Sequence, residues 1–272
     1  MLARGPVSTG DSIESAVLEL ETPGKIDPSV LEGCRAVIHL AARIPTNHGH
    51  IDEASLCWQA NVLGTLKLVD AMNSAGVKRL IQTTSANAYA PWVNRPDELA
   101  PMFPNSRIYY LTSKIAQELY ANSRCAELGI GITTLRISSV YGTASHRAPI
   151  TLIARQMLDG ATVRLASGGE FGADFVTDED VAQAIFIVME TSALGPFNVG
   201  SGTRSTLREI AQRLAELTAT PQGRIVFAKP SQETDRGFPA IDNQKLVSLG
   251  FCPTPLDQGL EALVKALKEP VH

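Results

Sequence analysis

The sequence lacks any long apolar run. Nowhere in its 272 residues do 18 consecutive apolar side chains occur, whereas a membrane-spanning helix needs about 20. The first ten residues, Met1 to Gly10, also lack the apolar segment of a secretory signal peptide. These two absences predict a cytoplasmic protein with no membrane partner.

The patterns of metal and nucleic-acid binding are missing as well. The four cysteines are widely separated, at Cys34, Cys57, Cys125 and Cys252. Because no Cys-x-x-Cys occurs, we expect reduced thiols and no zinc site. His48 and His50 lie close together, but no third ligand is evident, so we predict no metal. The net charge is −4 and no basic run occurs, which argues against a nucleic-acid partner.

What the sequence does contain is an alternation of strand-like and helical segments. With 44% hydrophobic and 19% charged residues, the chain suits one large α/β domain or one and a half domains. We predict strands over 35–42, 78–85 and 131–140, separated by helices over 55–75 and 109–128. This alternation predicts a parallel sheet that is covered by helices on both faces.

The second half of the chain has a looser rhythm. Helices are predicted over 149–158, 178–191, 206–217 and 256–267, with short strands over 162–166, 197–199 and 225–227. Ser205 or Thr206 is placed to cap the helix that follows it. These shorter elements predict a smaller α/β region after the main sheet.

Tyr110 and Lys114 are four residues apart in the helix predicted over 109–128, and therefore lie on one face of it. A phenol with a pKa near 10 is a poor base at neutral pH, and a nearby ammonium lowers that pKa. Such a pair can exchange a proton with a substrate hydroxyl while a hydride moves at the same carbon. The alternative is a surface tyrosine beside a solvated lysine.

Ser85 ends the strand predicted over 78–85. In a parallel sheet, groups at the carboxyl ends of the strands face the ligand crevice. A hydroxyl in that place can hydrogen-bond a reacting oxygen, although a simple turn residue at the end of a strand explains Ser85 equally well.

Several motifs follow one another along the chain. They are Val37-Ile-His-Leu-Ala-Ala42, Asn61-Val-Leu-Gly-Thr65, the Ser85 segment, Tyr110-x-x-x-Lys114, Val140-Tyr-Gly142, Asp174-Phe-Val-Thr-Asp-Glu-Asp-Val181 and Phe197-Asn-Val-Gly-Ser201. Their order resembles that of the extended short-chain dehydrogenase/reductase family of nucleotide-sugar epimerases and dehydratases, over roughly residues 15 to 268. The resemblance implies a Rossmann-like doubly wound parallel sheet with a small C-terminal α/β substrate domain. Residues 1–145, interleaved with 175–200, would bind the cofactor, and 146–272 would mainly bind substrate.

The resemblance also implies roles for the matching residues. Tyr110 would be the general acid or base, Lys114 would hold the nicotinamide ribose, and Ser85 would bind the substrate oxygen. The residues implied to contact NAD or NADP are Tyr110, Lys114, Asn61, Ala41 and Ala42. Asn61 is otherwise an ordinary polar helix residue, and the two alanines otherwise serve tight packing. His39, in the same stretch, is interpreted as structural.

The sequence departs from the family pattern at its start, because no Gly-x-x-Gly-x-x-Gly turn occurs. Such a turn brings a pyrophosphate to a helix N-terminus. Met1–Gly5 resembles the end of the helix that should follow, so the sheet is expected to be N-terminally incomplete. Either the sequence starts too late, or neighbouring strands close the gap, or another element fills it. In the last two cases the chain is expected to bind a dinucleotide poorly. Lys25 falls where an acid usually contacts adenine.

A further departure concerns the substrate. Ala173 stands where the family has an arginine for the nucleotide diphosphate, and Arg164 or Arg236 is expected to supply that charge. The alternative is that both are solvated surface arginines.

The residues after Ser85 bear on the reaction. Ala86 and Asn87 stand where the dehydratases carry an Asp-Glu pair. We therefore expect an NAD(P)-dependent epimerase or keto-reductase acting on a nucleotide-linked sugar or similar secondary alcohol. The alternative is a non-catalytic relative that acts as a binding or partner protein.

The resemblance further implies a homodimer, built from the helices over 55–75 and 109–128. Leu66, Ala116 and Leu119 are candidates for that contact, or for ordinary core. The loop 90–107 is expected to cover the substrate.

Overall fold

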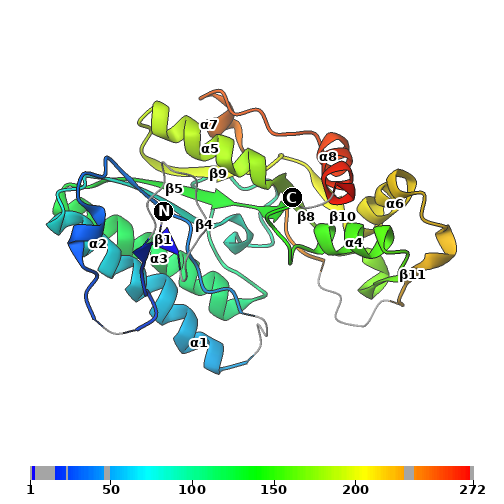
Figure 1. Ribbon diagram of the computed structural model, residues 1–272, viewed down its shortest axis with the longest axis horizontal. Coiled ribbons are helices and arrows are strands. Elements are labelled where there is room, and N and C mark those ends of the chain that lie inside the picture. The colour runs from blue at the N-terminus through cyan, green and yellow to red at the C-terminus, as the bar shows by residue number, and fades with distance from the viewer. Residues whose placement is uncertain (1, 4–15, 23, 46–49, 230–235, 270–272) are drawn as a thin grey trace. The chain divides into compact units, whose positions relative to one another are not determined.

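The computed structural model describes residues 2–3, 16–22, 24–45, 50–229 and 236–269 (Figure 1). The chain forms two compact units. The first consists of Met1–Ala90, Met102–Leu135 and Ala193–Pro196, and the second of Pro91–Pro101, Arg136–Ser192 and Phe197–His272. Each unit is described by itself below.

The main sheet has four strands in the order β3-β4-β5-β9. Their bounds are β3 Val37–His39, β4 Arg79–Ser85, β5 Gly131–Ile137 and β9 Gly195–Val199. Strands β3 and β4 run parallel, with Val37 opposite Leu80 and His39 opposite Gln82. After its first residue every side chain of β4 is buried, as expected of a strand covered on both faces. The predicted α/β class with a parallel sheet is confirmed.

A second, short parallel pair joins β1, Leu2–Ala3, to β2, Ala16–Val17. This pairing corrects the prediction of a helix end at Leu2–Ala3, whereas Met1, Arg4 and Gly5 lie outside the described residues. Within the described residues, Leu2–Ala3 find backbone hydrogen-bond partners on β2, so they satisfy their polar groups without a helical turn.

The predicted helix over 55–75 is a continuous helical stretch in three parts. It comprises α1, Asp52–Cys57, a π-helical turn, η2, over Trp58–Leu63, and α2, Gly64–Ser74. Gly64 allows a close approach, because a Cβ there would lie 2.9 Å from the Cβ of Leu20 and 3.0 Å from its carbonyl oxygen. A π-helical turn is rare and often marks a functional position.

The long helix α3 spans Ile108–Leu128, and the predicted helix over 109–128 is confirmed. It ends at Gly129, whose left-handed conformation (φ +61°) suits glycine, and the Ile130 N–H returns to the Cys125 carbonyl at 2.9 Å. The α2 and α3 helices pack against each other and share one apolar core with β3 and β4. Its buried members are Ile26, Leu31, Val37, Leu68, Val69, Ala71, Met72, Val77, Leu80, Cys125 and Ile130.

The second unit contains two small sheets. One has the order β10-β8-β6, from Arg204–Thr206, Gly172–Thr177 and Ser139–Tyr141, and the other pairs β11, Ile225–Phe227, with β7, Val163–Leu165. Its helices are α4 Pro149–Leu158, α5 Asp178–Glu190, α6 Leu207–Thr218, α7 Gln244–Val247 and α8 Leu256–Lys268. Thr206 caps α6 in a capping box with Glu209, which confirms the predicted cap.

Asp174 organises the second unit. Its side chain is 1% exposed and accepts hydrogen bonds from Ser201 N at 2.7 Å, Ser201 Oγ at 2.9 Å, Gly202 N at 2.9 Å and Ile241 N at 3.2 Å. Burial raises the pKa of this carboxyl, and the four donors oppose that rise. The carboxylate thereby ties strand β8 to two segments that are distant in the sequence.

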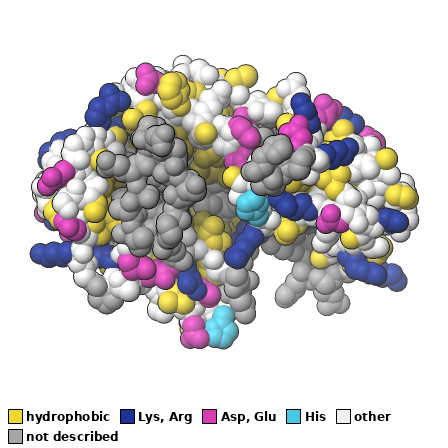
Figure 2. All heavy atoms as spheres, in the orientation of Figure 1, with side chains coloured by type: hydrophobic (Ala, Val, Ile, Leu, Met, Phe, Trp, Pro, Cys, Tyr) yellow, Lys and Arg dark blue, Asp and Glu magenta, His cyan; other side chains and the backbone are white. Residues whose placement is uncertain are grey.

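The described residues also bear on membrane-spanning helices, disulfides and surface charge. None of their helices combines the length and the apolar character needed to cross a bilayer. All four cysteines are free thiols, as predicted. On the face in Figure 2, cationic and acidic side chains are interspersed, and the described part of that face carries no continuous basic patch.

Candidate functional site

Helix α3 runs antiparallel to strand β4. Lys78 Nζ, just before β4, donates to the carbonyl of Leu128 at the end of α3 (3.2 Å), and Gln117 Nε2 donates to Gln82 Oε1 further along both elements (3.1 Å). The beginning of α3 therefore lies at the carboxyl end of β4. Seven helical residues and three strand residues both span roughly 10 Å, so Tyr110 comes level with Ser85.

Ser85 ends β4 and caps the short helix η3, Ala86–Ala88, by accepting from Asn87 N at 3.3 Å. Helix α3 packs against both β4 and η3. Ser85 is buried and Tyr110 half-buried. The structure thus brings the strand-end hydroxyl and the first turn of the tyrosine helix to the same end of the sheet.

Lys114 lies on α3 between Tyr110 and Gln117, and only 2% of its surface is exposed. Its Nζ donates to Gln117 Oε1 at 2.5 Å. Burial lowers the pKa of Lys114 to about 7, and the carboxylate of Glu118 opposes that fall. Loss of water around an ammonium group disfavours its charged form.

The pKa of Tyr110 corrects one expectation. We predicted that Lys114 lowers it, but burial raises the pKa of Tyr110 to about 12, and the counteracting cation is Arg107. The Lys114 ammonium donates to Gln117 instead, and the cost of burying a phenolate is the largest cause of the rise. In the chain alone the tyrosine is protonated at neutral pH.

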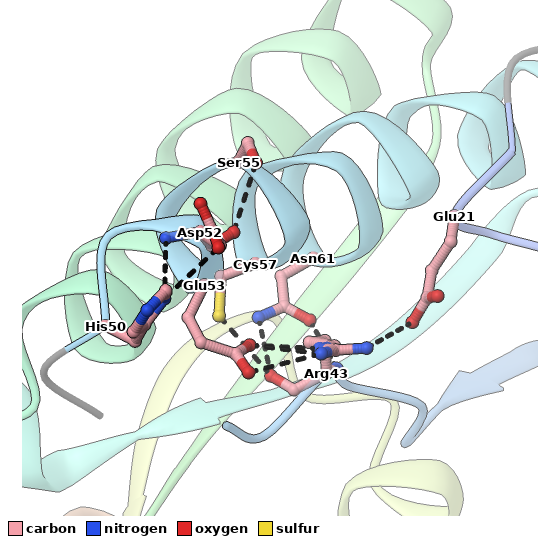
Figure 3. Close-up of polar contacts among 8 residues, drawn as sticks. All are labelled: Glu21, Arg43, His50, Asp52, Glu53, Ser55, Cys57 and Asn61. Carbon is pink, nitrogen blue, oxygen red and sulfur yellow. Dashed lines mark hydrogen bonds and ion pairs between the residues drawn. The ribbon is translucent and has the colours of Figure 1, made fainter. Parts of the chain in front are cut away.

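Asn61, in the π-helical turn, connects the segment after β3 to the tyrosine helix. Figure 3 shows its contacts with Arg43. Asn61 is fully buried. Its Oδ1 accepts from Arg43 N at 2.7 Å, and its Nδ2 donates to Arg43 O at 3.2 Å and to Ser113 Oγ at 2.9 Å. Ser113 Oγ in turn donates to the carbonyl of Tyr110 at 2.7 Å. Asn61 therefore fixes the backbone beside Ala42 and the first turn of α3 together.

Arg43 is a residue of this site that the sequence reasoning missed. Its guanidinium donates to both carboxylate oxygens of Glu53 at 3.2–3.3 Å and lies 3.8 Å from Glu21 (Figure 3). Ala41, two residues earlier, is exposed, and Ala42 is half-buried. The available signal was an arginine directly after the two alanines, with an acid in the first turn of the next helix.

His39 is buried, and its Nε2 lies 2.8 Å from Thr65 Oγ1. Because the Thr65 hydroxyl donates to Asn61 O at 2.6 Å, it accepts from His39, which assigns the ring proton to Nε2. Burial lowers the pKa of His39 to about 3, and the charge of Lys114 adds to that fall. The arrangement agrees with a structural histidine.

His39 gives the fold a pH dependence. Its pKa is depressed in the folded chain, so the unfolded state binds the extra proton between about pH 6.5 and about pH 3. Stability is therefore complete above pH 6.5 and is lost as pH falls. We expect His39→Gln to remove roughly 3 kcal/mol of the difference in unfolding free energy between pH 7 and pH 4. Urea titrations of both proteins at the two pH values measure this difference. If both proteins lost the same unfolding free energy between pH 7 and pH 4, the prediction would be contradicted.

Comparison with known proteins places the chain in a family. The model of the NAD dependent epimerase/dehydratase family matches residues 11–200. The chain belongs to that family. This membership confirms the predicted resemblance and the predicted Rossmann-like fold.

Individual relatives are remote in sequence. The dTDP-L-rhamnose 4-epimerase of Burkholderia thailandensis is 25% identical, with 95% of this chain and 82% of that enzyme covered. The UDP-glucose 4-epimerase of Mycolicibacterium smegmatis is 26% identical, with 68% of this chain and 60% of that enzyme covered. The solved structure of MoeE5 in complex with UDP-glucuronic acid and NAD superposes with a TM-score of 0.84 at 25% identity, over 97% of this chain and 88% of that one.

The two arginines predicted to bind a diphosphate, Arg164 and Arg236, lie in the second unit, and both are exposed. Arg164 points outward from β7. Arg204, which the sequence reasoning did not single out, donates to the carbonyls of Phe238 at 3.2 Å and Arg236 at 2.5 Å. Ala173, on β8, is buried. The roles of Arg164 and Arg236 stay predictions.

The predicted absence of a metal site concerns His48 and His50. His48 lies outside the described residues, and His50 Nδ1 lies 3.3 Å from Asp52 Oδ2. Among the residues that the structure describes, no group of three or more His, Cys, Asp or Glu side chains is arranged to hold a metal ion.

The donor set at the end of β4 fits the nicotinamide half of a dinucleotide. Ser85 and Tyr110 offer hydroxyls, and Lys114 offers an ammonium of which one hydrogen is committed to Gln117. Exposed Ala41 presents little side chain beside the backbone. A ribose and a reacting oxygen require donors of this kind.

Proposed function

We propose that this chain is an NAD(P)-dependent epimerase or keto-reductase that acts on a nucleotide-linked sugar or a similar secondary alcohol. The observation that carries the proposal is the antiparallel course of α3 along β4, which brings Tyr110 level with Ser85. Family membership and relatives named as UDP-glucose and dTDP-L-rhamnose 4-epimerases support the choice of substrate class.

The proposed chemistry assigns one task to each residue. Ser85 hydrogen-bonds the substrate oxygen, and Tyr110 exchanges a proton with it. The phenol that predominates at neutral pH can donate to a ketone oxygen, whereas taking a proton from an alcohol needs the Lys114 ammonium to stabilise the phenolate. When bound, a nicotinamide accepts and returns the hydride.

The cofactor contacts proposed are those of the first unit. Lys114 would hold the ribose, Tyr110 and Asn61 would line the same region, and Ala41 and Ala42 would lie beside the dinucleotide. The hydrogen bonds of Asn61 to the backbone N–H and carbonyl of Arg43 hold the segment after Ala42 in place, which supports a cofactor contact there. The second unit, with Arg164 and Arg236, would bind the nucleotide diphosphate.

Dehydration is the less favoured reaction. The residues that follow Ser85 are Ala86, Asn87 and Ala88 of η3, none of which carries a carboxyl group. A β-elimination of water needs an acid and a base at the carbons involved. The short helix supplies neither, which favours transfer of hydride without elimination.

We also propose a cytoplasmic homodimer. Ala116 is buried in the core and Leu66 is half-buried, but Leu119 is 62% exposed. Near it, Trp58 and Tyr120 meet edge to face at 6.0 Å and are each partly exposed. An apolar surface of this kind suits a contact between copies. Sedimentation velocity tests it, because a single species of monomer mass would exclude the dimer.

The function is tested by incubating the purified chain with NAD or NADP and with UDP- or dTDP-hexoses. Proton NMR of the sugar detects an epimer or a change at a keto carbon, and calorimetry detects cofactor binding. We expect turnover, with weaker cofactor binding than in a relative that carries the Gly-x-x-Gly-x-x-Gly turn. Neither binding nor product with any of these sugars would favour the non-catalytic relative that acts as a binding partner.

A further inference from the structure

A chain of three buried polar side chains leads away from Lys114 into the first unit. Lys114 Nζ donates to Gln117 Oε1 at 2.5 Å, Gln117 Nε2 donates to Gln82 Oε1 at 3.1 Å, and Gln82 Nε2 donates to Thr134 Oγ1 at 3.0 Å. Gln117, Gln82 and Thr134 are each at most 1% exposed. Helix α3 thereby connects to β4 and β5 through side-chain amides, in addition to the apolar core that it shares with β4.

The hydrogen bonds from Lys114 to Thr134 have a fixed direction. A glutamine amide has a donor end and an acceptor end, and Gln117 Nε2 also reaches the carbonyl of Thr83 at 3.5 Å. With its donor end committed to β4, Gln117 turns its oxygen toward Lys114. The opposite orientation would bring an NH₂ group against an ammonium and take the donor away from Gln82 Oε1, which is costly in a buried place.

We propose that Gln117, oriented by Gln82, is a positioning residue that holds the Lys114 ammonium at the end of β4 and stabilises its charge. This role deepens the proposed function, because the held ammonium is the one assigned to the ribose and to Tyr110. A buried ammonium needs an acceptor to keep its proton, and Gln117 is the acceptor that contacts it.

Other titratable groups lie around Lys114. Helix α3 packs against α1, η2, α2, β4 and η3. The titratable side chains on those elements, with those of β3 and the neighbouring part of α3, are His39, Asp52, Glu53, Cys57, Lys67, Asp70, Arg79, Tyr110 and Glu118. His39 titrates near pH 3 and Tyr110 near pH 12. Neither changes charge near the Lys114 midpoint, which burial lowers to a pKa of about 7.

The test is the titration of Lys114 itself, in the full chain without cofactor. Lysine labelled with ¹³C and ¹⁵N reports protonation through the Cε and Nζ shifts, and a Lys114→Met spectrum assigns the signal. We expect Gln117→Leu to lower the midpoint by about one pH unit, because a hydrogen bond to a charged group is lost. Gln117→Glu should raise it, because a carboxylate then faces the ammonium.

Two further variants separate positioning from general damage. Gln82→Met frees the orientation of Gln117 without touching Lys114, so it should lower the midpoint by a smaller amount. Thr133→Val is the matched control, since it removes a part-buried hydrogen bond to Ala193 O from the same strand as Thr134. It should leave the midpoint unchanged.

The outcomes are distinct. Opposite shifts in Gln117→Leu and Gln117→Glu, with no shift in Thr133→Val, support the proposal. An unchanged midpoint in the two Gln117 variants, or an equal shift in the control, overturns it. Should Gln117→Leu fail to fold, Gln117→Glu and Gln82→Met still decide the sign. Because the titration needs no turnover, its failure is separate from a failure of the proposed catalysis.

Discussion

Replacing Tyr110 with phenylalanine is expected to reduce turnover of a nucleotide-linked sugar by about a thousandfold, within the range typical of a lost general acid or base. The substitution removes only the hydroxyl, from a half-buried position at the start of α3. Cofactor affinity should fall far less than turnover, because Lys114 and Asn61 remain among the residues proposed to contact the cofactor. Steady-state kinetics and calorimetry on the same preparation measure both quantities.

Tyr109 provides the matched control. It precedes Tyr110, shares its half-buried character and lies in the same helical turn. Tyr109→Phe should keep at least half of the wild-type kcat. If Tyr110→Phe retained more than a tenth of the turnover, or if both variants lost it equally, Tyr110 would not be the proton-transfer group.

Replacing Asp174 with alanine is expected to destabilise the chain by roughly 3–5 kcal/mol, because buried donors lose their charged acceptor. The residues left without that acceptor are Ser201, Gly202 and Ile241. For a chain of this size the melting temperature should fall by about 10 °C. Circular dichroism during thermal and urea unfolding gives both numbers.

The control is an aspartate on the surface. Asp257, at the start of α8, forms an exposed ion pair with Arg213 at 3.0 Å. Exposed pairs contribute about 0–1 kcal/mol, so Asp257→Ala should leave the melting temperature nearly unchanged. A similar loss of stability in the two variants would show that the hydrogen bonds of Asp174 have no special weight.

Much of the fold could be predicted from periodicity. The strand β4 and the helix α3 coincide to within a residue with predicted segments. The strand β3 is shorter than the predicted 35–42, and the predicted strand 131–140 is divided at Ser138 into β5 and β6, which belong to different sheets. Of the two residues predicted to cap α6, Ser205 and Thr206, the structure selects Thr206. These features are local, so the sequence carries them within a few residues.

Strand β8, Gly172–Thr177, was missed. It has a buried aspartate near its centre, and aspartate is depleted in strands. Only the donors supplied by Ser201, Gly202 and Ile241 make that position acceptable. The residues of the strand itself do not indicate hydrogen-bond donors that lie 27 to 67 residues away in the sequence.

Most of the candidate site could be predicted as a set of residues, but not as a network. Tyr110, Lys114 and Ser85 were identified, whereas the contact of Lys114 with Gln117 was not, and neither was the raised pKa of Tyr110. Both depend on how deeply the side chains are buried. The pairing of Gln117 with Gln82 joins residues 35 positions apart, and only the packing of α3 on β4 brings them together.

A crystal structure of the chain with a nicotinamide cofactor and a nucleotide-linked sugar tests the central claim most directly. The account predicts Tyr110 Oη and Ser85 Oγ within about 3 Å of one oxygen of the sugar, with Lys114 Nζ still on Gln117. A sugar whose reacting oxygen contacts neither hydroxyl, or a cofactor bound away from the end of β4, would contradict it.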